Sequence, residues 1–356
     1  MSIILTKSLP LIRQWEKDRL DVNEILMSQY GAWDMGIRHT KSPRSILSPA
    51  NKKLAELSYG NVVKIPVFEA QGVSITNTRS CTIPDMENTT ALIQLAFTQI
   101  SWGFSMWPDQ YMTGTQPMNF IGYDSDYSMK VSEINLQLMA QQDTAVRNAV
   151  DLACNTYWPA NIATSYYPVV ANALQVTQAE KDDAFNQLAA IMNELDFYGK
   201  MDVLGSTKLT TITRRLNAQG KENATNESFQ FMLGAFAFSS SNRITSATGV
   251  SATGYCIREG SIALFNANNP SSIAKRTVGA GEFPTYQWDT MYWPWLNMEV
   301  GTYLTNGCGS NNGGFMTDTS TLRTGFSWDT QWGILLPPPN NLHGQTPIIK
   351  FEISAT

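Results

Sequence analysis

The chain has few charged residues and almost no histidine, and both shortages limit what it can do. Only 15% of its 356 residues are Asp, Glu, Lys or Arg, and the formal net charge is −5 without a block of like charges. This argues against a nucleic-acid reader held by a basic patch. Only His39 and His343 could act as imidazole bases, and both are predicted to be ordinary surface or loop histidines.

Motifs for nucleotide binding, acyl transfer and metal binding are also missing. The sequence contains no G-x-x-x-x-G-K-[ST], no G-x-G-x-x-G and no G-x-S-x-G. The four cysteines, Cys81, Cys154, Cys256 and Cys308, form no C-x-x-C pair and no Cys/His cluster. A zinc site or a disulfide framework is therefore not expected, and separate thiols fit a reducing compartment. We predict no catalytic residue, no cofactor and no metal.

Long apolar runs are absent as well. No stretch approaches 18 apolar residues, so no transmembrane helix is predicted, and the first residues do not form a signal peptide. Hydrophobic residues still make up 43% of the chain, enough for one large core or two smaller ones. The chain has 10 tryptophans and little charge, which favours a surface covered by partners.

Residues 124–158 contain no glycine and no internal proline, and they predict one long helix. Ser125 or Asp126 can cap its start, and Pro159 disfavours helix at the residue before it. About 30 helical residues would span roughly 45 Å. Asp124 and Asp126 lack the Gly and the Glu of a calcium loop, so helix capping is the better interpretation. The predicted core of this helix is Ile134, Leu138, Ala145 and Leu152, on a stripe with Met129 and Ala149.

The N-terminal part predicts segments that cannot be stable alone. Residues 9–29 predict an amphipathic helix that ends at Gly31, and residues 32–58 look irregular. Together these residues have too little apolar material for a core. Residues 61–107 predict an extended two-stranded ribbon with a polar tip at 76–80 and a bulge or bend where the apolar phase changes at Gln99. Such a ribbon is marginal in water. We therefore predict contacts with neighbouring subunits at Trp15, Thr76, Asn77, Thr78, Arg79, Trp102 and Phe104.

The second half predicts a mixed α+β unit followed by three strands. Helix 178–198 has a capping box at Thr177 and Glu180, and its predicted apolar face is Phe185, Leu188, Ala189, Met192 and Leu195. This helix and helix 207–217 accompany strands near 201–204, 229–238 and 254–265. Strands are then expected at 295–304, 325–335 and 347–353, and the first has Met298, Val300, Thr302 and Leu304 on one face. The tryptophan-rich stretch 288–295 predicts packing at a sheet edge or a subunit contact, with a carbohydrate-binding groove as the alternative.

This order of elements resembles the major capsid proteins of tailed bacteriophages, the Hong Kong 97-type fold shared with encapsulins. Three stretches carry the resemblance. Gly-Asn-Val-Val-Lys-Ile-Pro-Val at 60–67 resembles an E-loop entry strand. Gly-Tyr-Cys-Ile-Arg-Glu-Gly at 254–260, with the apolar strand after it, resembles the A-domain hairpin. Pro-Ile-Ile-Lys-Phe-Glu-Ile at 347–353 resembles the closing strand.

The resemblance implies an α+β fold with named parts. Residues 1–58 would be the N-terminal arm, 59–118 the extended β-hairpin E-loop, and 119–159 the spine helix of the P domain. Residues 160–285 would be the A domain, and 286–356 the returning strands of the P domain.

The resemblance also implies a structural function without catalysis. The chain would self-assemble through hexamers and pentamers into an icosahedral shell around double-stranded DNA, which it contacts non-specifically. It would be located in the virion after assembly in the host bacterial cytoplasm, without contact with a membrane. Any scaffolding, portal and decoration proteins would be separate partners. The alternatives are an encapsulin-type compartment shell and a β-rich carbohydrate-binding or carbohydrate-cleaving protein.

Some members of this family crosslink an E-loop lysine to an asparagine of a neighbouring subunit. Lys64 is the only lysine in residues 60–118, and it lies at the base of the predicted ribbon. We therefore predict no such crosslink. Denaturing gels of intact particles would contradict this prediction by showing a ladder of covalent oligomers.

Overall fold

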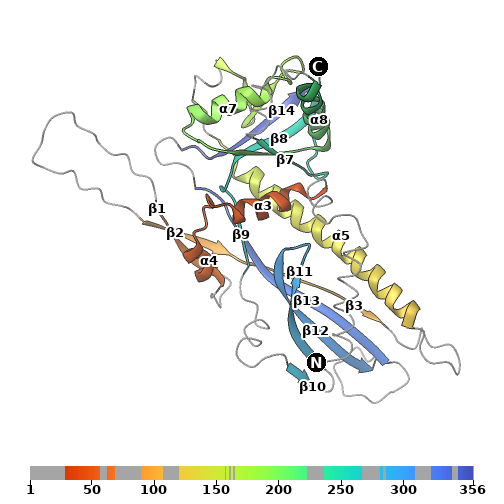
Figure 1. The fold of residues 1–356 in the computed structure, drawn as a ribbon. Coiled ribbons are helices and arrows are strands. Elements are labelled where there is room, and N and C mark those ends of the chain that lie inside the picture. Colours follow the sequence, from red (N-terminus) through yellow and green to blue (C-terminus); the bar gives the residue numbers. More distant parts are fainter. Residues whose placement is uncertain are drawn as a thin grey trace, which may run out of the picture.

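The computed structural model describes residues 29–56, 62–68, 90–106, 120–156, 158–159, 162, 165–222, 236–266, 281–283, 286–308, 322–338 and 344–355. These residues form an α+β fold, as predicted. A long helix runs beside two six-stranded sheets that lie toward opposite ends of the molecule, and a two-stranded ribbon projects to one side (Figure 1). The ribbon consists of β1 (Val62–Phe68) and β2 (Thr90–Ala96).

The first sheet, which we call the β13 sheet, has the order β10-β11-β12-β13-β3, and β9 also pairs with β13. One of its strands has a buried face. Met298, Val300, Thr302 and Leu304 alternate along one strand and are all buried, as the sequence pattern predicted. Its strands are β3 (Thr98–Met106), β9 (Ala263–Asn266), β10 (Gly281–Phe283), β11 (Tyr286–Trp293), β12 (Met298–Cys308) and β13 (Leu322–Leu335).

The second sheet, which we call the β14 sheet, has the order β4-β5-β14-β8-β6-β7. Helices α7 (Ala184–Glu194) and α8 (Thr207–Glu222) lie at this end of the molecule (Figure 1). Its strands are β4 (Val169–Val170), β5 (Ala173–Val176), β6 (Met201–Gly205), β7 (Phe236–Ser240), β8 (Val250–Arg258) and β14 (Ile348–Ser354).

Two strand predictions are corrected by this topology. The stretch 254–265 is two strands in two sheets, because the chain turns at Gly260, where φ is +82°. An added Cβ at Gly260 would lie 2.3 Å from the carbonyl oxygen of Arg44, so only glycine fits there. The last strand does not return to the sheet of β12 and β13. It pairs with β5 and β8, and Ile348, Ile349 and Phe351 are fully buried because both of its faces are covered.

The long helix is α5 (Phe120–Leu152), with 33 residues and a length of about 50 Å. It begins earlier than predicted, so Ser125 and Asp126 lie inside it and do not cap it. Asp126 instead forms an ion pair with Lys130 at 2.8 Å, one turn away. The helix ends at Leu152, before the position where Pro159 was predicted to stop it.

The face that α5 buries differs from the predicted one. Leu138 is 4% exposed, whereas Leu152 is 86% exposed and Ala145 is also exposed; Ile134 is only partly buried. The prediction that Ile134, Ala145 and Leu152 belong to the core is therefore wrong. Apolar residues alone did not define the face, because the buried side also carries polar groups. Its buried residues are Tyr127, Val131, Ser132, Asn135, Leu138, Met139, Gln142, Asp143, Val146 and Val150.

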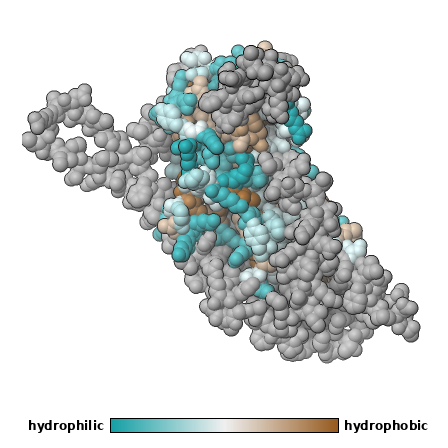
Figure 2. Space-filling view, viewed as in Figure 1, coloured by the Kyte–Doolittle hydropathy of each residue, from teal (hydrophilic) through white to brown (hydrophobic). Residues whose placement is uncertain are grey.

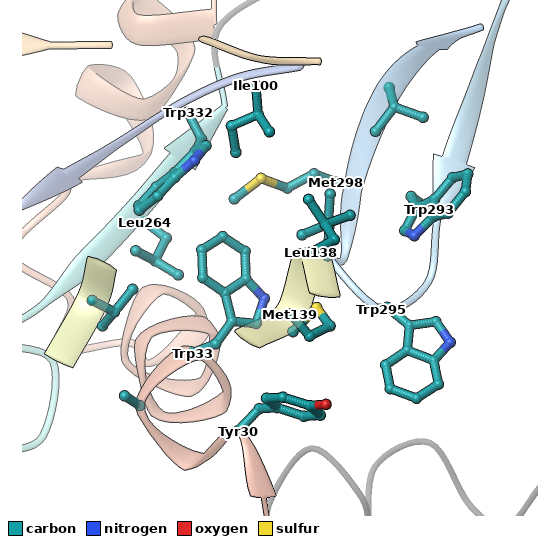
Figure 3. Packing of buried hydrophobic residues seen from close by; sticks show 14 of the residues in the cluster. Tyr30, Trp33, Ile100, Leu138, Met139, Leu264, Trp293, Trp295, Met298 and Trp332 are labelled. Atoms are coloured by element: carbon teal, nitrogen blue, oxygen red, sulfur yellow. The ribbon is translucent and has the colours of Figure 1, made fainter. Parts of the chain in front are cut away.

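The segment before the ribbon is helical, not irregular. It forms α3 (Gly31–Lys41) and α4 (Pro49–Glu56), and Gly31, which was predicted to end a helix, begins one. Trp33 of α3 is fully buried and its ring meets that of Trp332 edge-on, with centroids 5.1 Å apart (Figure 3). Leu138 and Met139 of α5 complete this contact. The predicted helix 9–29 lies outside the described residues.

The helix predicted at 178–198 is shorter than expected. Residues 178–183 form turns, and α7 covers only the middle of the predicted range. The Thr177 hydroxyl still donates to Glu180 at 2.7 Å, but this pair stabilises the preceding turn and not the helix start. The predicted apolar face is largely correct, because Phe185, Leu188 and Met192 are buried against the β14 sheet.

Candidate functional site

The β1–β2 ribbon projects to one side of the described chain and forms a sheet of its own (Figure 1). Its strands pair antiparallel along seven residues each, from Val62 opposite Ala96 to Phe68 opposite Thr90. Among the described residues, no third strand pairs with either of them. Pro66 lies within β1 and has no amide hydrogen, which suits a strand with a free edge. A two-stranded ribbon is marginal in water, so it needs a further surface to pack on.

Two residues predicted to face neighbouring subunits are partly buried and also pack within the chain itself, and their role in subunit contacts stays a prediction. Trp102 and Phe104 belong to β3, which leaves the ribbon after Phe97 and pairs with β13. The Trp102 ring packs on Trp293 at 5.5 Å, and the Phe104 ring packs on Tyr127 at 5.4 Å. The phase change near Gln99 therefore marks a switch between two sheets and not a bend in one ribbon.

The other predicted contacts are not described by the structure. Trp15, Thr76, Asn77, Thr78 and Arg79 lie outside the described residues. Their role in subunit contacts stays a prediction.

Helix α3 is held at its N-terminus by a carboxylate from α5. Asp143 is fully buried, and its Oδ1 accepts hydrogen bonds from the backbone amides of Ala32 at 2.9 Å and Trp33 at 3.1 Å. Its other oxygen accepts from the hydroxyl of Ser241, just after β7. Asp143 thus caps a helix that has no side-chain cap of its own, since Tyr30 makes no such bond.

Burial raises the pKa of Asp143, although the hydrogen bonds from Ser241, Trp33 and Ala32 act in the opposite direction. Desolvation is therefore the larger influence on this carboxyl group. Burying the Asp143 carboxyl group costs free energy. Its three hydrogen bonds offset part of this cost, because without it three buried donors would lack an acceptor.

The C-terminal half of α3 is fastened to the β14 sheet by a second polar cluster. The Arg38 guanidinium donates to Asp34 on its own helix and to Asp202 on β6, both at 3.0 Å, and to the hydroxyl of Ser239 on β7. His39 Nε2 lies 3.0 Å from the same oxygen of Asp202. His39 is fully buried, so the prediction that it is a surface or loop histidine is wrong. It was misread because α3 was not recognised as a helix. His343 lies outside the described residues.

Burial also raises the pKa of Asp34, and its ion pair with Arg38 acts against this. Together, Asp143 and the Arg38 cluster join α3 to α5, β6 and β7. These contacts tie the long helix and the β14 sheet to α3. The sequence did not mark Asp143 or Asp202 as a contact of α3, because each lies in a segment with the pattern of an ordinary helix or strand.

A third polar group lies near the end of α5. Asp151 Oδ1 accepts from Lys350 Nζ at 3.0 Å and from the Tyr255 hydroxyl at 2.8 Å. Burial acts to raise the pKa of Asp151, but these two hydrogen bonds and the positive charges of Lys350 and Arg147 together outweigh it, and the pKa is lowered. Burial raises the pKa of the nearby Cys154 thiol to about 12, so this cysteine is not a reactive thiolate.

Neither sugar stacking nor metal chemistry has support in the described residues. Trp293 and Trp295 are 1% and 2% exposed, and the Trp293 indole donates to Asn135 at 2.9 Å. These two rings fill the core, which contradicts the alternative of a carbohydrate groove built on them (Figure 3). No group of three His, Cys, Asp or Glu side chains in the described ranges could hold a metal ion. None of the helices described here has the length and hydropathy needed to cross a bilayer.

Several apolar side chains are exposed on the single chain. On α5 these are Met129, which is 57% exposed, Leu136 and Leu152. Figure 2 shows one face of the molecule, where the described residues are mostly hydrophilic with smaller apolar areas among them. On that face, the apolar areas of the described residues are small and separated by hydrophilic ones.

Comparison with known proteins finds similarity in structure but not in sequence. No family model and no curated protein sequence matches the chain. Among solved structures, it is similar to the capsid of the cyanophage P-SCSP1u, with a TM-score of 0.45 and 10% identity over 84% of this chain and 85% of that one. It is also similar to the capsid of Ralstonia phage GP4, with a TM-score of 0.44 and 11% identity over 85% and 86%. The cyanophage Pam1 capsid gives 0.43 and 11% over 85% and 87%.

Proposed function

We propose that this chain is the major capsid protein of a tailed phage, with the Hong Kong 97-type fold. It assembles through hexamers and pentamers into an icosahedral shell that encloses double-stranded DNA. The observation that carries the proposal is the two-stranded β1–β2 ribbon, which pairs with no third strand among the described residues and is joined through β3 to a body of one long helix and two sheets.

The ribbon supports self-assembly because of its own instability. A pair of strands without a third strand gains little from burial and is marginal in water. In an assembly, the surface of a neighbouring copy supplies the missing contact. The free energy that the ribbon lacks in one subunit is then gained at the interface, which couples its ordering to shell formation.

The rigid body suits the same function. Asp143 and the Arg38 cluster fasten α3 to α5 and to β6, and the rings of Trp33 and Trp332 pack the space between α3 and β13. A subunit whose elements are joined by this many non-covalent contacts can transmit mechanical load from one interface to another with little change in shape. A shell under internal pressure needs that property.

The charge of the chain agrees with a container and not with a tight DNA binder. A net charge of −5 with no basic patch favours weak, non-specific contact with the enclosed DNA. We infer a purely structural role without catalysis, a location in the virion and assembly in the cytoplasm of the host bacterium. Scaffolding, portal and decoration proteins would act as separate chains.

The proposal is tested by shortening the ribbon. Phe68 and Thr90 are paired, so replacing residues 69–89 with Asn-Gly should close the hairpin with a two-residue turn. The matched control replaces residues 309–321 with Asn-Gly, because Cys308 and Leu322 are paired in the same way. Both variants should remain folded by circular dichroism.

Electron microscopy of the purified proteins then gives the answer. The unmodified chain and the control variant should form closed shells, and the variant with the shortened ribbon should remain as subunits or small oligomers. Monodisperse monomers from the unmodified chain under all assembly conditions would contradict the proposal. Closed shells from the shortened ribbon would contradict the role given to it.

A further inference from the structure

The exposed side of α5 carries few charges for a helix of its length, which runs along one side of the molecule (Figure 1). Among its nine exposed residues only Glu133 is charged. Surface helices normally carry charged side chains on the side that faces solvent. The exposed side of α5 is therefore suited to contact with another protein surface. The nine residues are Ser125, Met129, Glu133, Leu136, Gln137, Gln141, Ala145, Asn148 and Leu152.

Five residues of α5 form a stripe that is symmetric about its centre. They follow one another at spacings of three, four, four and three residues, and they are Glu133, Leu136, Ala140, Thr144 and Arg147. Residues three or four apart share one face of a helix, so the five side chains project in similar directions. All five are exposed or partly exposed in the single chain, and Leu136 is 41% exposed. The stripe thus has opposite charges at its two ends and a small residue in the middle.

The two charges at the ends of the stripe form no ion pair with another described residue. The ion pairs of α5 in the described part of the chain involve neither Glu133 nor Arg147. The charge of Arg147 helps to lower the pKa of Asp151, but the hydrogen bonds to that carboxylate come from Lys350 and Tyr255. Glu133 and Arg147 are also about 21 Å apart along the helix, so they cannot pair with each other.

A second copy of α5 can supply both partners if it packs antiparallel across a two-fold axis at Ala140. Position 140 then meets itself, Leu136 meets Thr144 of the other copy, and Glu133 meets Arg147 of the other copy. The Thr144 hydroxyl already donates to the Ala140 carbonyl at 2.7 Å, so its methyl group can pack on Leu136. The small side chain of Ala140 allows the two helix axes to approach to about 8 Å.

We propose that α5 forms a two-fold contact between copies of this chain, with Ala140 on the axis and a Glu133–Arg147 ion pair on each side of it. The inference rests on the proposed function, because an icosahedral shell relates neighbouring capsomers by two-fold axes. A contact of this kind closes at two copies, whereas a contact around a ring joins each copy to two others.

A cysteine at the centre of the stripe tests the two-fold geometry. Ala140→Cys places two thiols across the axis, where the Cα atoms can reach the ~4.4–6.8 Å that a disulfide needs. Ala145→Cys is the matched control, because Ala145 is exposed on the same helix but lies off the stripe. The original chain, which has four cysteines, gives the background.

Particles are oxidised mildly and analysed by denaturing electrophoresis without reductant. Ala140→Cys should give disulfide-linked dimers at a yield about tenfold above both controls, without higher oligomers, because only position 140 lies on the axis. The oxidation is repeated on concentrated soluble subunits, where dimers are also expected because a two-fold contact needs no shell.

Charge exchange tests the ion pairs. In the Ala140→Cys chain, Glu133→Arg and Arg147→Glu should each lower the dimer yield about tenfold, because like charges then face each other across the axis. The double variant exchanges the two charges and should restore the yield to within about twofold. Since the two positions cannot touch within one chain, restoration requires a contact between copies. If Arg147→Glu fails to fold, Glu133→Arg still decides, because Glu133 is exposed.

The proposal is overturned if Ala140→Cys and Ala145→Cys give equal yields, if Ala140→Cys gives a ladder of oligomers, or if Glu133→Arg changes nothing. A ladder would mean that a ring contact or the ribbon of a neighbouring copy covers α5. Absence of dimers from both particles and subunits also overturns it. Dimers from a chain that never forms particles would support the α5 contact and contradict the proposed function alone.

Discussion

The buried cap between α5 and α3 leads to a quantitative prediction. Asp143→Ala removes the acceptor for the amides of Ala32 and Trp33 and for the hydroxyl of Ser241, all in the interior. Each buried donor left without a partner costs about 1–3 kcal/mol. Removal of a buried carboxylate returns part of this, since burial raises the pKa of Asp143. We expect a net loss of about 2–5 kcal/mol, a large share of the 5–15 kcal/mol typical of a folded protein.

Two further variants make the reasoning testable. Asp143→Asn keeps an oxygen for both amides and can donate its NH₂ to the Ser241 hydroxyl, so it should cost only about 1 kcal/mol. Asp126→Ala removes a surface ion pair on the same helix and should cost about 0.5 kcal/mol or less. Urea unfolding of the soluble subunit, followed by tryptophan fluorescence, gives the free energies. Equal losses for Asp143→Ala and Asp143→Asn would refute the hydrogen-bond argument.

The difference in unfolding free energy between the original chain and Asp143→Asn should change with pH in a definite direction. The folded-state pKa of Asp143 lies above its ordinary value of 3.8. The contribution of this group to stability is therefore fully present below about pH 4 and is lost as the pH rises through the raised pKa. The stability of the original chain relative to Asp143→Asn should fall with rising pH across that window. A difference that grows with pH would contradict the dominance of burial.

Three other predictions follow from particular contacts. Leu138→Asp should abolish soluble protein in an expression test because it buries a charge, whereas Leu136→Asp on the same helix, at a position that is 41% exposed, should remain soluble. Gly249→Ala, with φ at +83° and open space around it, should lower the urea-unfolding free energy by about 1 kcal/mol, and Gly260→Ala, with a similar φ, should lower it by more because its Cβ meets the Arg44 carbonyl. Charged residues introduced near Thr78 should leave folded subunits that do not close into shells under the electron microscope, and normal shells would contradict the contact predicted there.

Local patterns were reliable where one element has one buried face. The alternation in β12 correctly predicted its buried residues, and the periodicity of α7 correctly predicted Phe185, Leu188 and Met192. These patterns work because a strand or helix packed on one side repeats its apolar residues with its own period. The same logic failed for α5. That helix packs on several elements and uses polar groups such as Asn135 and Asp143 as interior contacts.

The candidate sites were not predictable in the same way. Asp143 and Ala32 are 111 residues apart, and Arg38 and Asp202 are 164 apart. No local pattern links such pairs, because their proximity follows from the packing of α3 against both sheets. The polar cluster around His39 has the same origin, since its members come from α3, β6 and β7.

The sequence by itself determined that the chain is α+β, that it contains one very long helix, and that a ribbon precedes this helix. Composition, hydrophobic periodicity and the absence of breakers act locally, so they are sufficient for these features. Only the tertiary structure decided which sheet each strand joins, that α3 is an interior helix, and which polar residues are buried. Those outcomes depend on contacts between distant segments, where burial and hydrogen bonding are settled together and no single stretch of sequence contains the answer.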